Sequence, residues 1–196
     1  MPTAVKMTVD EFVEEFHRNP EEMCRYDLHD GEPVMSAAAE PTPFHGELQG
    51  AVIYMLRLYA KRHKGTRVFG PVHVEFSPGM YRGPDITMLL PRSETVVTEE
   101  RLKGVPSLVV EIVSPAKPGL DLIKKRGLYT ASKVPEIWFL DSVENEALFL
   151  FRQGVSYHEK ALKVGLDESP VIRGLRFGVA ALFTLDLEKL EASLER

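Results

Sequence analysis

Four short apolar runs predict the strands of a central sheet. Residues 86–90 and 108–113 are almost continuously apolar, which is typical of strands buried on both faces. Residues 136–140 form a third such run, and residues 72–76 alternate apolar and polar positions like a half-buried strand. A hairpin is expected at 147–159 around Gln153-Gly154, and another at 25–36 around Asp30-Gly31.

Capping signals and apolar residues at helical spacing predict the helices. Thr8 and Glu11 form a capping box, so a short helix should run to about residue 17. Thr42 is expected to cap a long helix that ends near Gly65 and buries Phe44, Leu48, Val52, Met55 and Tyr59. Residues 120–132 form the next helix, and a terminal helix should start at Thr184 as its cap.

The order of these elements predicts an α/β fold. A strand, a helix of about a dozen residues and another strand make a crossover unit, so residues 108–140 belong to a mixed sheet flanked by helices. Residues 91–106 are a polar connection with a helical turn at 99–103, and short strands lie near 171–177. We expect one domain over 1–196, with a core at 42–141, a helix and hairpin at 8–36, and a hairpin and helix at 145–195.

Composition narrows the class of protein. Cys24 is the only cysteine, which excludes an intramolecular disulfide and a cysteine-based zinc site. No apolar run approaches the roughly 20 residues that span a bilayer, and the first 15 residues do not resemble a signal peptide, so a cytoplasmic protein is expected. The net charge of −5 disfavours a passive DNA-binding module more than a metal-dependent nuclease, whose carboxylates hold cations.

Three charged residues carry the candidate chemistry. Glu111 lies amid aliphatic residues of the 108–113 run, where a carboxylate is costly to bury unless it is paired or binds metal. Asp85 opens the 86–90 strand, which would bring two carboxylates together if the strands are neighbours. Two oxygen ligands suit Mg²⁺, and Lys125 on the following helix could hold the attacking water or neutralise transition-state charge.

These residues lie in segments that resemble the Uma2 family (DUF820), a restriction-endonuclease-like branch of the PD-(D/E)XK nuclease superfamily. The similar segments keep the family order: Tyr26-Asp27-Leu28-His29-Asp30-Gly31-Glu32, Pro84-Asp85-Ile86-Thr87, Val110-Glu111-Ile112-Val113-Ser114-Pro115, 121–129 with Asp121, Lys125 and Tyr129, and Val134-Pro135-Glu136-Ile137-Trp138.

The resemblance implies a DNA endonuclease that uses Mg²⁺ (or Mn²⁺), with Asp85 and Glu111 as metal ligands and Lys125 as the third catalytic residue. His45 and Ser114 are candidates to support a metal ligand from behind or to contact a phosphate. Cutting both strands favours a homodimer. The general superfamily pattern has lysine two residues after the acid, where this chain has Val113. In Uma2 proteins the lysine is thought to have moved to the next helix, where Lys124 lies beside Lys125.

Other interpretations of the same residues stay open. Glu111 and Lys125 could form a purely structural salt bridge on an inactive nuclease scaffold that acts by binding nucleic acid or a partner. The substrate could also be RNA or a nucleotide. His45 alone is more typical of a polar surface residue, Glu75 is expected to face solvent, and core positions are expected for Tyr129, Trp138, Phe149 and Phe151.

Overall fold

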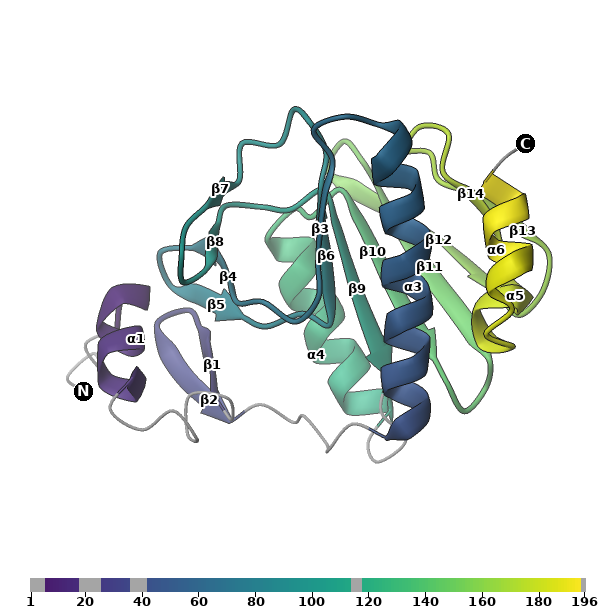
Figure 1. Ribbon diagram of the computed structural model, residues 1–196. Coiled ribbons are helices and arrows are strands. Elements are labelled where there is room, and N and C mark those ends of the chain that lie inside the picture. The colour runs from purple at the N-terminus through teal and green to yellow at the C-terminus, as the bar shows by residue number, and fades with distance from the viewer. Residues whose placement is uncertain (1–5, 18–25, 36–41, 114–117, 195–196) are drawn as a thin grey trace.

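The computed structural model describes residues 6–17, 26–35, 42–113 and 118–194 (Figure 1). In chain order the elements are α1 (Val9–His17), β1 (Tyr26–His29), β2 (Glu32–Met35), α3 (Pro43–Arg62), β3 (Arg67–Phe69), β4 (Val74–Ser77), β5 (Met80–Arg82), β6 (Ile86–Leu89), β7 (Val96–Val97), β8 (Leu102–Lys103), β9 (Leu108–Val113), α4 (Pro118–Ala131), β10 (Glu136–Asp141), β11 (Glu146–Gln153), β12 (Ser156–Leu162), β13 (Leu166–Glu168), β14 (Arg176–Gly178), α5 (Val179–Phe183) and α6 (Leu187–Leu194).

The larger mixed sheet has the strand order β12-β11-β10-β9-β6-β3. β9 and β10 are parallel and are joined by α4, which confirms the predicted crossover, whereas β6 runs antiparallel to β9. Both β6 and β9 are buried along their whole length, as their continuous apolar runs predict. The α/β class with a mixed sheet is therefore confirmed.

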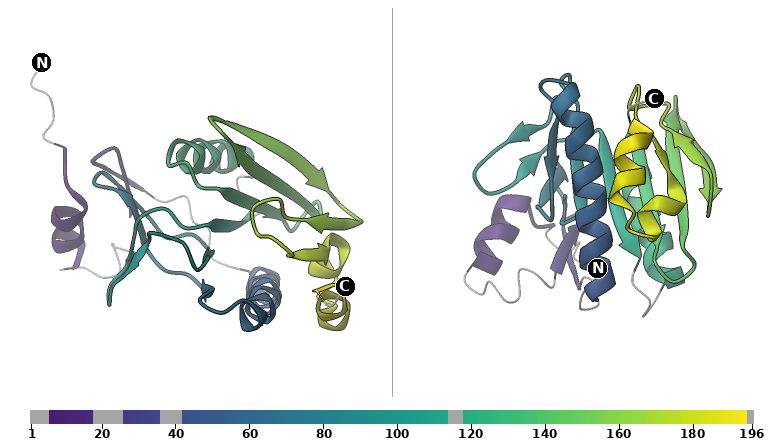
Figure 2. Two further views of the ribbon diagram at one scale, coloured as in Figure 1. Left: turned by 90° about the horizontal axis from the view of Figure 1, so that it is seen from above. Right: turned by 45° about the vertical axis from the view of Figure 1, so that its right-hand side comes forward.

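Helices cover both faces of this sheet. α3, α5 and α6 pack on the face that presents Met88, Val110 and Trp138, and Figure 2 shows α3 and α6 together on that side. α4 lies on the opposite side of the sheet (Figure 2), where Tyr129 packs in the cluster that contains Val109. The alternation of side chains along β9 thus places Glu111 on the α4 side, together with Val109.

A second sheet, in the order β2-β1-β5-β4-β8-β7, was not predicted. It contains β4, which was expected in the central sheet; the edge strand of the central sheet is β3 instead. The strands of the second sheet are only two to four residues long, as their bounds show. The pairs β1–β2, β4–β5 and β7–β8 are local, but β1–β5 and β4–β8 join segments that are far apart in the sequence. The expected helical turn at 99–103 is wrong, because Leu102 pairs with Val74 in this sheet and is buried against it. The sheet joins the N-terminal hairpin to β5, whose last residue is Arg82.

Caps explain where the helices begin, with one correction. The Thr8 hydroxyl accepts from the Glu11 amide at 3.2 Å, and the Thr42 hydroxyl accepts from the His45 amide at 3.2 Å, as predicted. Thr184 does not start the terminal helix but ends α5. Asp186 caps α6 instead, because its carboxylate accepts from the Lys189 amide at 3.0 Å. Leu185, with φ of 55°, interrupts the helical backbone between α5 and α6.

The chain near the C-terminus differs in detail from expectation. β13 and β14 form a two-stranded sheet, and the residues near Val171 lie in the connection between these strands rather than in a strand.

Among the described residues, no helix has the length and apolar character needed to cross a membrane.

Candidate active site

The sheet register brings the two candidate carboxylates together. Ile86 is paired with Val110, so Asp85, one residue before β6, lies beside Glu111. The Asp85 Oδ2 atom accepts from the Ile112 backbone amide at 2.7 Å, which ties the start of β6 to β9. The expectation that these strands are neighbours is therefore confirmed.

Asp85 also receives two contacts from α3. The Gln49 side-chain amide donates to the Asp85 carbonyl at 3.0 Å, and His45 Nε2 lies 3.4 Å from Asp85 Oδ1. This contact with the carboxylate raises the pKa of His45, against the opposing effect of partial burial. His45 thus faces the site, contrary to the plain surface role that its position alone favours.

Glu111 is held in the interior by two hydrogen-bond donors and by an ion pair with an arginine. Its side chain is 3% exposed. Lys125 Nζ donates to Oε2 at 2.8 Å, the Tyr129 hydroxyl donates to Oε1, and Arg82 Nε lies 3.6 Å from Oε1. Burial raises the pKa of Glu111, and the Lys125 ammonium opposes that effect.

Lys125, and not Lys124, reaches the carboxylate. Lys125 is half-buried and points from α4 to Glu111, whereas Lys124 is exposed. Tyr129 lies four residues after Lys125, which places both on one face of α4. Val113, at the position where the general superfamily has its lysine, is buried in the core on the α4 side.

Arg82 and Asp27 complete the site, and sequence reasoning did not assign either of them to it. Arg82 NH1 lies 3.3 Å from Asp27 Oδ2, and both side chains are buried at 7% and 8% exposure. The Arg82 guanidinium also lies 5.9 Å from the Tyr129 ring centroid. Asp27 comes from β1, so the N-terminal hairpin reaches the neighbourhood of Glu111 through Arg82. The available signals were the family-like hairpin and an arginine three residues before Asp85.

Several other predicted residues have different outcomes. Tyr129 is buried, as expected of a core residue, but its hydroxyl also binds the candidate carboxylate. Glu75 does not simply face solvent, because its carboxylate accepts from Arg101 Nε at 2.8 Å. Trp138, Phe149 and Phe151 belong to the core as predicted. Ser114 lies outside the described residues.

The donor set suits a small divalent cation. Each carboxylate oxygen carries two lone pairs, so an oxygen that accepts one hydrogen bond can still bind a cation. Mg²⁺ in proteins commonly binds one or two carboxylates and keeps several of its waters. Asp85 and Glu111 could supply these two carboxylates. Over the described ranges, no cluster of three or more His, Cys, Asp or Glu side chains offers a more complete cage.

The sequence of the chain matches that of one known family over residues 13–186, described as "Uma2: Putative restriction endonuclease". The protein belongs to the Uma2 family. A search of curated proteins finds no match. Among solved structures, it resembles "a putative nuclease belonging to DUF820" from Anabaena variabilis ATCC 29413, at 18% identity and a TM-score of 0.71, over 91% of this chain and 98% of that one.

The structural likeness extends the family match to the fold. At 18% identity over nearly the whole of both chains, the Anabaena protein shows that the two chains share one architecture. The family description supports a nuclease, and the neighbouring carboxylates lie in the segments on which the Uma2 resemblance was based.

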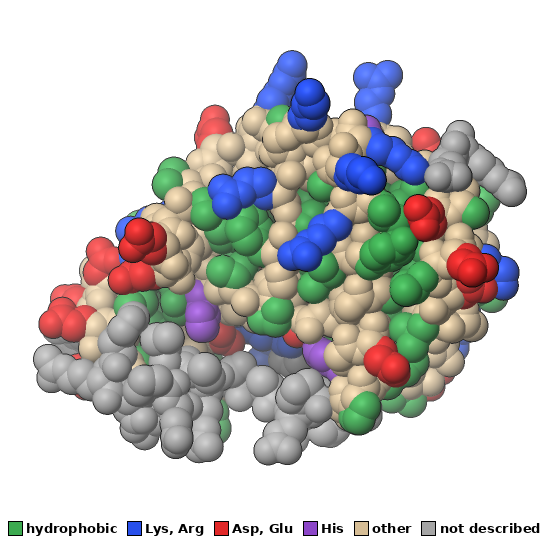
Figure 3. Space-filling model, viewed as in Figure 1, with side chains coloured by type: hydrophobic (Ala, Val, Ile, Leu, Met, Phe, Trp, Pro, Cys, Tyr) green, Lys and Arg blue, Asp and Glu red, His purple; other side chains and the backbone are tan. Residues whose placement is uncertain are grey.

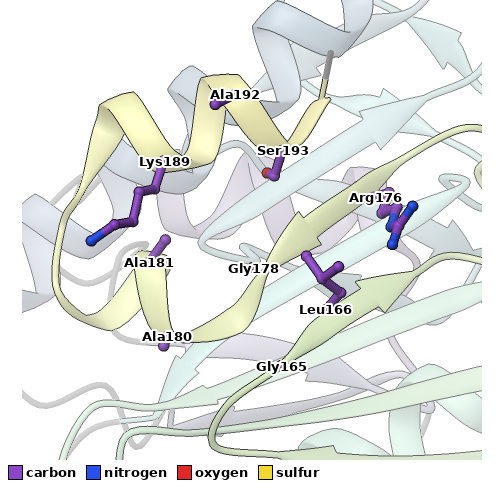
Figure 4. Close-up of a pocket in the computed structure, with 9 residues that line it drawn as sticks. All are labelled: Gly165, Leu166, Arg176, Gly178, Ala180, Ala181, Lys189, Ala192 and Ser193. Atoms are coloured by element: carbon purple, nitrogen blue, oxygen red, sulfur yellow. The ribbon is translucent and has the colours of Figure 1, made fainter. Parts of the chain in front are cut away.

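A separate pocket of this Uma2 protein offers no comparable chemistry. It lies between β13–β14 and the helices α5 and α6 (Figure 4). Gly165, Gly178 and three alanines form much of its lining, with Arg176 and Lys189 as its charged residues. The lining of this pocket contains no carboxylate, imidazole or thiol, so the Asp85–Glu111 site is the stronger candidate for an active site.

Proposed function

We propose that this protein is a metal-dependent endonuclease that hydrolyses DNA phosphodiester bonds. The observation that carries the proposal is the position of Asp85 beside Glu111 on neighbouring strands, with Lys125 bound to Glu111 at 2.8 Å. Two adjacent carboxylates and a lysine are the minimum set for metal-assisted phosphodiester hydrolysis.

In this proposal Asp85 and Glu111 hold Mg²⁺ or Mn²⁺. The cation would lower the pKa of a bound water and bind the scissile phosphate. Lys125 holds its ammonium against Glu111, from where it can orient the attacking water or neutralise charge on the phosphoryl oxygens. His45 contacts Asp85 from the other side, and in its charged form it is suited to contact a phosphate.

The alternative is an inactive nuclease scaffold that acts by binding. A structural salt bridge also predicts the contact between Lys125 and Glu111, and Arg82 and Tyr129 add two further groups that could serve only to stabilise a buried carboxylate. The two functions differ in metal affinity, because a scaffold does not need Asp85 and Glu111 to bind a divalent cation.

The deciding experiment is nicking of supercoiled plasmid with Mg²⁺ or Mn²⁺, compared with EDTA. The variants are Asp85→Asn and Lys125→Met, and Lys124→Met is the matched control because Lys124 is exposed next to the candidate lysine. The nuclease predicts nicking that EDTA abolishes, that both folded site variants lose by about 100-fold or more, and that Lys124→Met retains.

Calorimetric titration with Mn²⁺ gives a second result that does not depend on turnover. Binding by the wild type that Asp85→Asn removes would support the metal site. Absence of both nicking and Mn²⁺ binding would favour the scaffold, whereas faster cleavage of RNA or a nucleotide ester would change the substrate class.

The proposal includes a homodimer in the cytoplasm. A double-strand cut requires chemistry on both strands, and two copies related by a two-fold axis would supply one site for each. Light scattering of the purified protein with and without a duplex checks the number of copies.

A further inference from the structure

Positive charge is concentrated in one stretch of this acidic protein. Between Glu47 and Glu75 the chain contains no aspartate or glutamate, but five lysines and arginines at positions 57, 61, 62, 64 and 67. The whole chain has a net charge of −5, so residues 48–74 carry +5 and the remainder carries −10. Such a segregation of charge marks a surface that attracts an anion.

All five cations are exposed, and four of them lie on the outer side of α3, just after it or at the start of β3. Arg57 and Lys61 lie four residues apart on α3, on the side opposite its buried residues such as Val52 and Met55. Lys64 follows the helix, and Arg67 begins β3, the edge strand of the larger sheet. We call Arg57, Lys61, Lys64 and Arg67 the cationic strip.

The other cation of the stretch has a different role. Arg62 NH1 donates to the Leu194 carbonyl at 2.9 Å, which attaches the end of α3 to the end of α6. Arg67 is exposed, and its guanidinium carbon lies 5.0 Å from the ring centroid of Phe69. Among the residues that the structure describes, no acidic side chain forms an ion pair with the four members of the strip.

The strip lies at and beyond the C-terminal end of α3, and the candidate active site adjoins its N-terminal end, where His45 contacts Asp85. Figure 3 shows Lys and Arg side chains gathered over the upper part of the face seen in Figure 1, with a hollow flanked by histidine side chains below them. His45 lies in the first turn of α3, and Arg57 and Lys61 lie 12 and 16 residues further along the same helix. At 1.5 Å per residue these separations are about 18 and 24 Å.

This spacing suits a DNA duplex. A duplex rises about 3.4 Å per base pair, so the strip lies about five to seven base pairs from the site along a straight helix. Arg67 is paired with Leu89, the last residue of β6. Asp85 directly precedes β6, so Leu89 lies about 13 Å from Asp85 along the strand, at 3.3 Å per residue. The nearest aromatic side chains, Tyr54, Tyr59 and Phe69, are buried or half-buried, so the surface lacks the exposed rings on which single strands stack.

We infer that the cationic strip binds the phosphate backbone of duplex DNA on one side of the scissile bond. The inference rests on the proposed function and assigns it a substrate-holding surface remote from the carboxylates. Contacts of this kind are independent of base sequence and release counterions, so they make affinity depend steeply on salt.

The test is binding of a fluorescently labelled 30-base-pair duplex to the full-length protein, measured by anisotropy in EDTA between 50 and 300 mM KCl. The strip variant carries Arg57→Gln, Lys61→Gln, Lys64→Gln and Arg67→Gln. The matched control carries Arg152→Gln, Lys163→Gln, Arg176→Gln and Lys189→Gln, which removes four exposed charges from β11, the β12–β13 turn, β14 and α6. Both variants have the same net charge, and circular dichroism checks their folding.

We expect the strip variant to bind at least about 100-fold more weakly near 0.1 M salt. The slope of log K against log salt should become shallower by about 3.6, because each of the four lost phosphate contacts contributes about 0.9. The control should keep the wild-type slope. Equal losses of affinity in both variants would show that net charge alone is responsible and would overturn the inference. A strip variant that binds like the wild type would also overturn it, as would tighter binding of single-stranded DNA or duplex RNA by the wild type.

Plasmid nicking separates this inference from the function on which it rests. If the wild type nicks plasmid but the strip variant binds duplex DNA like the wild type, the proposed role of the strip is wrong and the proposed nuclease function is kept. If the wild type neither binds the duplex nor nicks plasmid, both proposals are wrong.

Discussion

Asp85 Oδ2 accepts a hydrogen bond from the backbone amide of Ile112 at 2.7 Å. The acid at the start of one strand is thereby fixed to the strand that carries Glu111, at the residue directly after it. Because the donor is a backbone amide within β9, it holds the Asp85 carboxylate at a fixed place beside Glu111. The contact gives the candidate metal ligands a preorganised arrangement.

Tyr129→Phe should destabilise the protein, because it removes a buried hydroxyl donor from Glu111. The ring would keep its packing on Phe76, 5.6 Å away between centroids, so the change isolates the hydrogen bond. We expect a loss of about 1–3 kcal/mol in the free energy of unfolding, measured by urea denaturation. Tyr26→Phe, in the smaller N-terminal core, is the control. An equal effect of both variants would show that the Glu111 contact contributes nothing specific.

Asp27→Asn tests the ion pair that links the N-terminal hairpin to the site. The Arg82 guanidinium is buried and lies 3.3 Å from the Asp27 carboxylate, so loss of that charge should cost about 1–3 kcal/mol. Asp30→Asn in the same hairpin changes an exposed acid and should stay within about 0.5 kcal/mol. Thermal unfolding of both variants makes the comparison, and equal melting temperatures would contradict a stabilising role for the pair.

Glu136 predicts a pH dependence of stability. It is fully buried, accepts from Trp138 Nε1 at 2.6 Å and from the Ser169 hydroxyl, and burial raises its pKa to about 7. The folded state therefore keeps this proton between about pH 4.5 and 7 while the unfolded state loses it. Its contribution to stability should fall by about 3 kcal/mol as pH rises through that window and stay level above it.

Urea denaturation of wild type and Glu136→Gln at pH 5, 6, 7 and 8 measures this contribution. The difference between the two proteins should change with pH only below about 7. A constant difference across the series would show that Glu136 keeps an ordinary pKa in the folded protein.

The imidazole of His45 should titrate above its usual pKa of 6.5. The cause is the neighbouring Asp85 carboxylate, which outweighs partial burial. In Asp85→Asn, the pKa of His45 should fall to 6.5 or below, because burial then dominates. Histidine side-chain resonances followed by NMR against pH give the result directly.

Gly50→Ala should stabilise the protein. Gly50 lies inside α3 on an exposed side, and a Cβ atom there would meet nothing within 4 Å. Alanine restricts the unfolded chain and favours the helix, so we expect a gain of about 0.5–1 kcal/mol in urea denaturation. Gly65→Ala is the contrasting control and should destabilise, because Gly65 has φ of +88° beside Pro91.

Local patterns predicted those elements whose stability is decided by neighbours in sequence. The apolar run at 108–113 gives β9 with the same bounds, and the capping residues Thr8 and Thr42 lie at the helix starts they indicated. The terminal helix was misplaced because Thr184 and Asp186 are both good caps, and only the backbone at Leu185, with φ of 55°, decides between them.

The sequence by itself determined the α/β order of elements, the acid buried in β9 and the helix that follows it. These features are local, because the spacing of apolar residues and the strand–helix–strand order can be recognised without any contact between distant segments. The tertiary structure decided which groups meet Glu111. Arg82 approaches it from a sheet of very short strands and is itself paired with Asp27. Lys125 differs from Lys124 only by the rotation of α4 on the sheet, which turns Lys125 toward Glu111. Such contacts depend on packing between segments far apart in the chain, which no local pattern records.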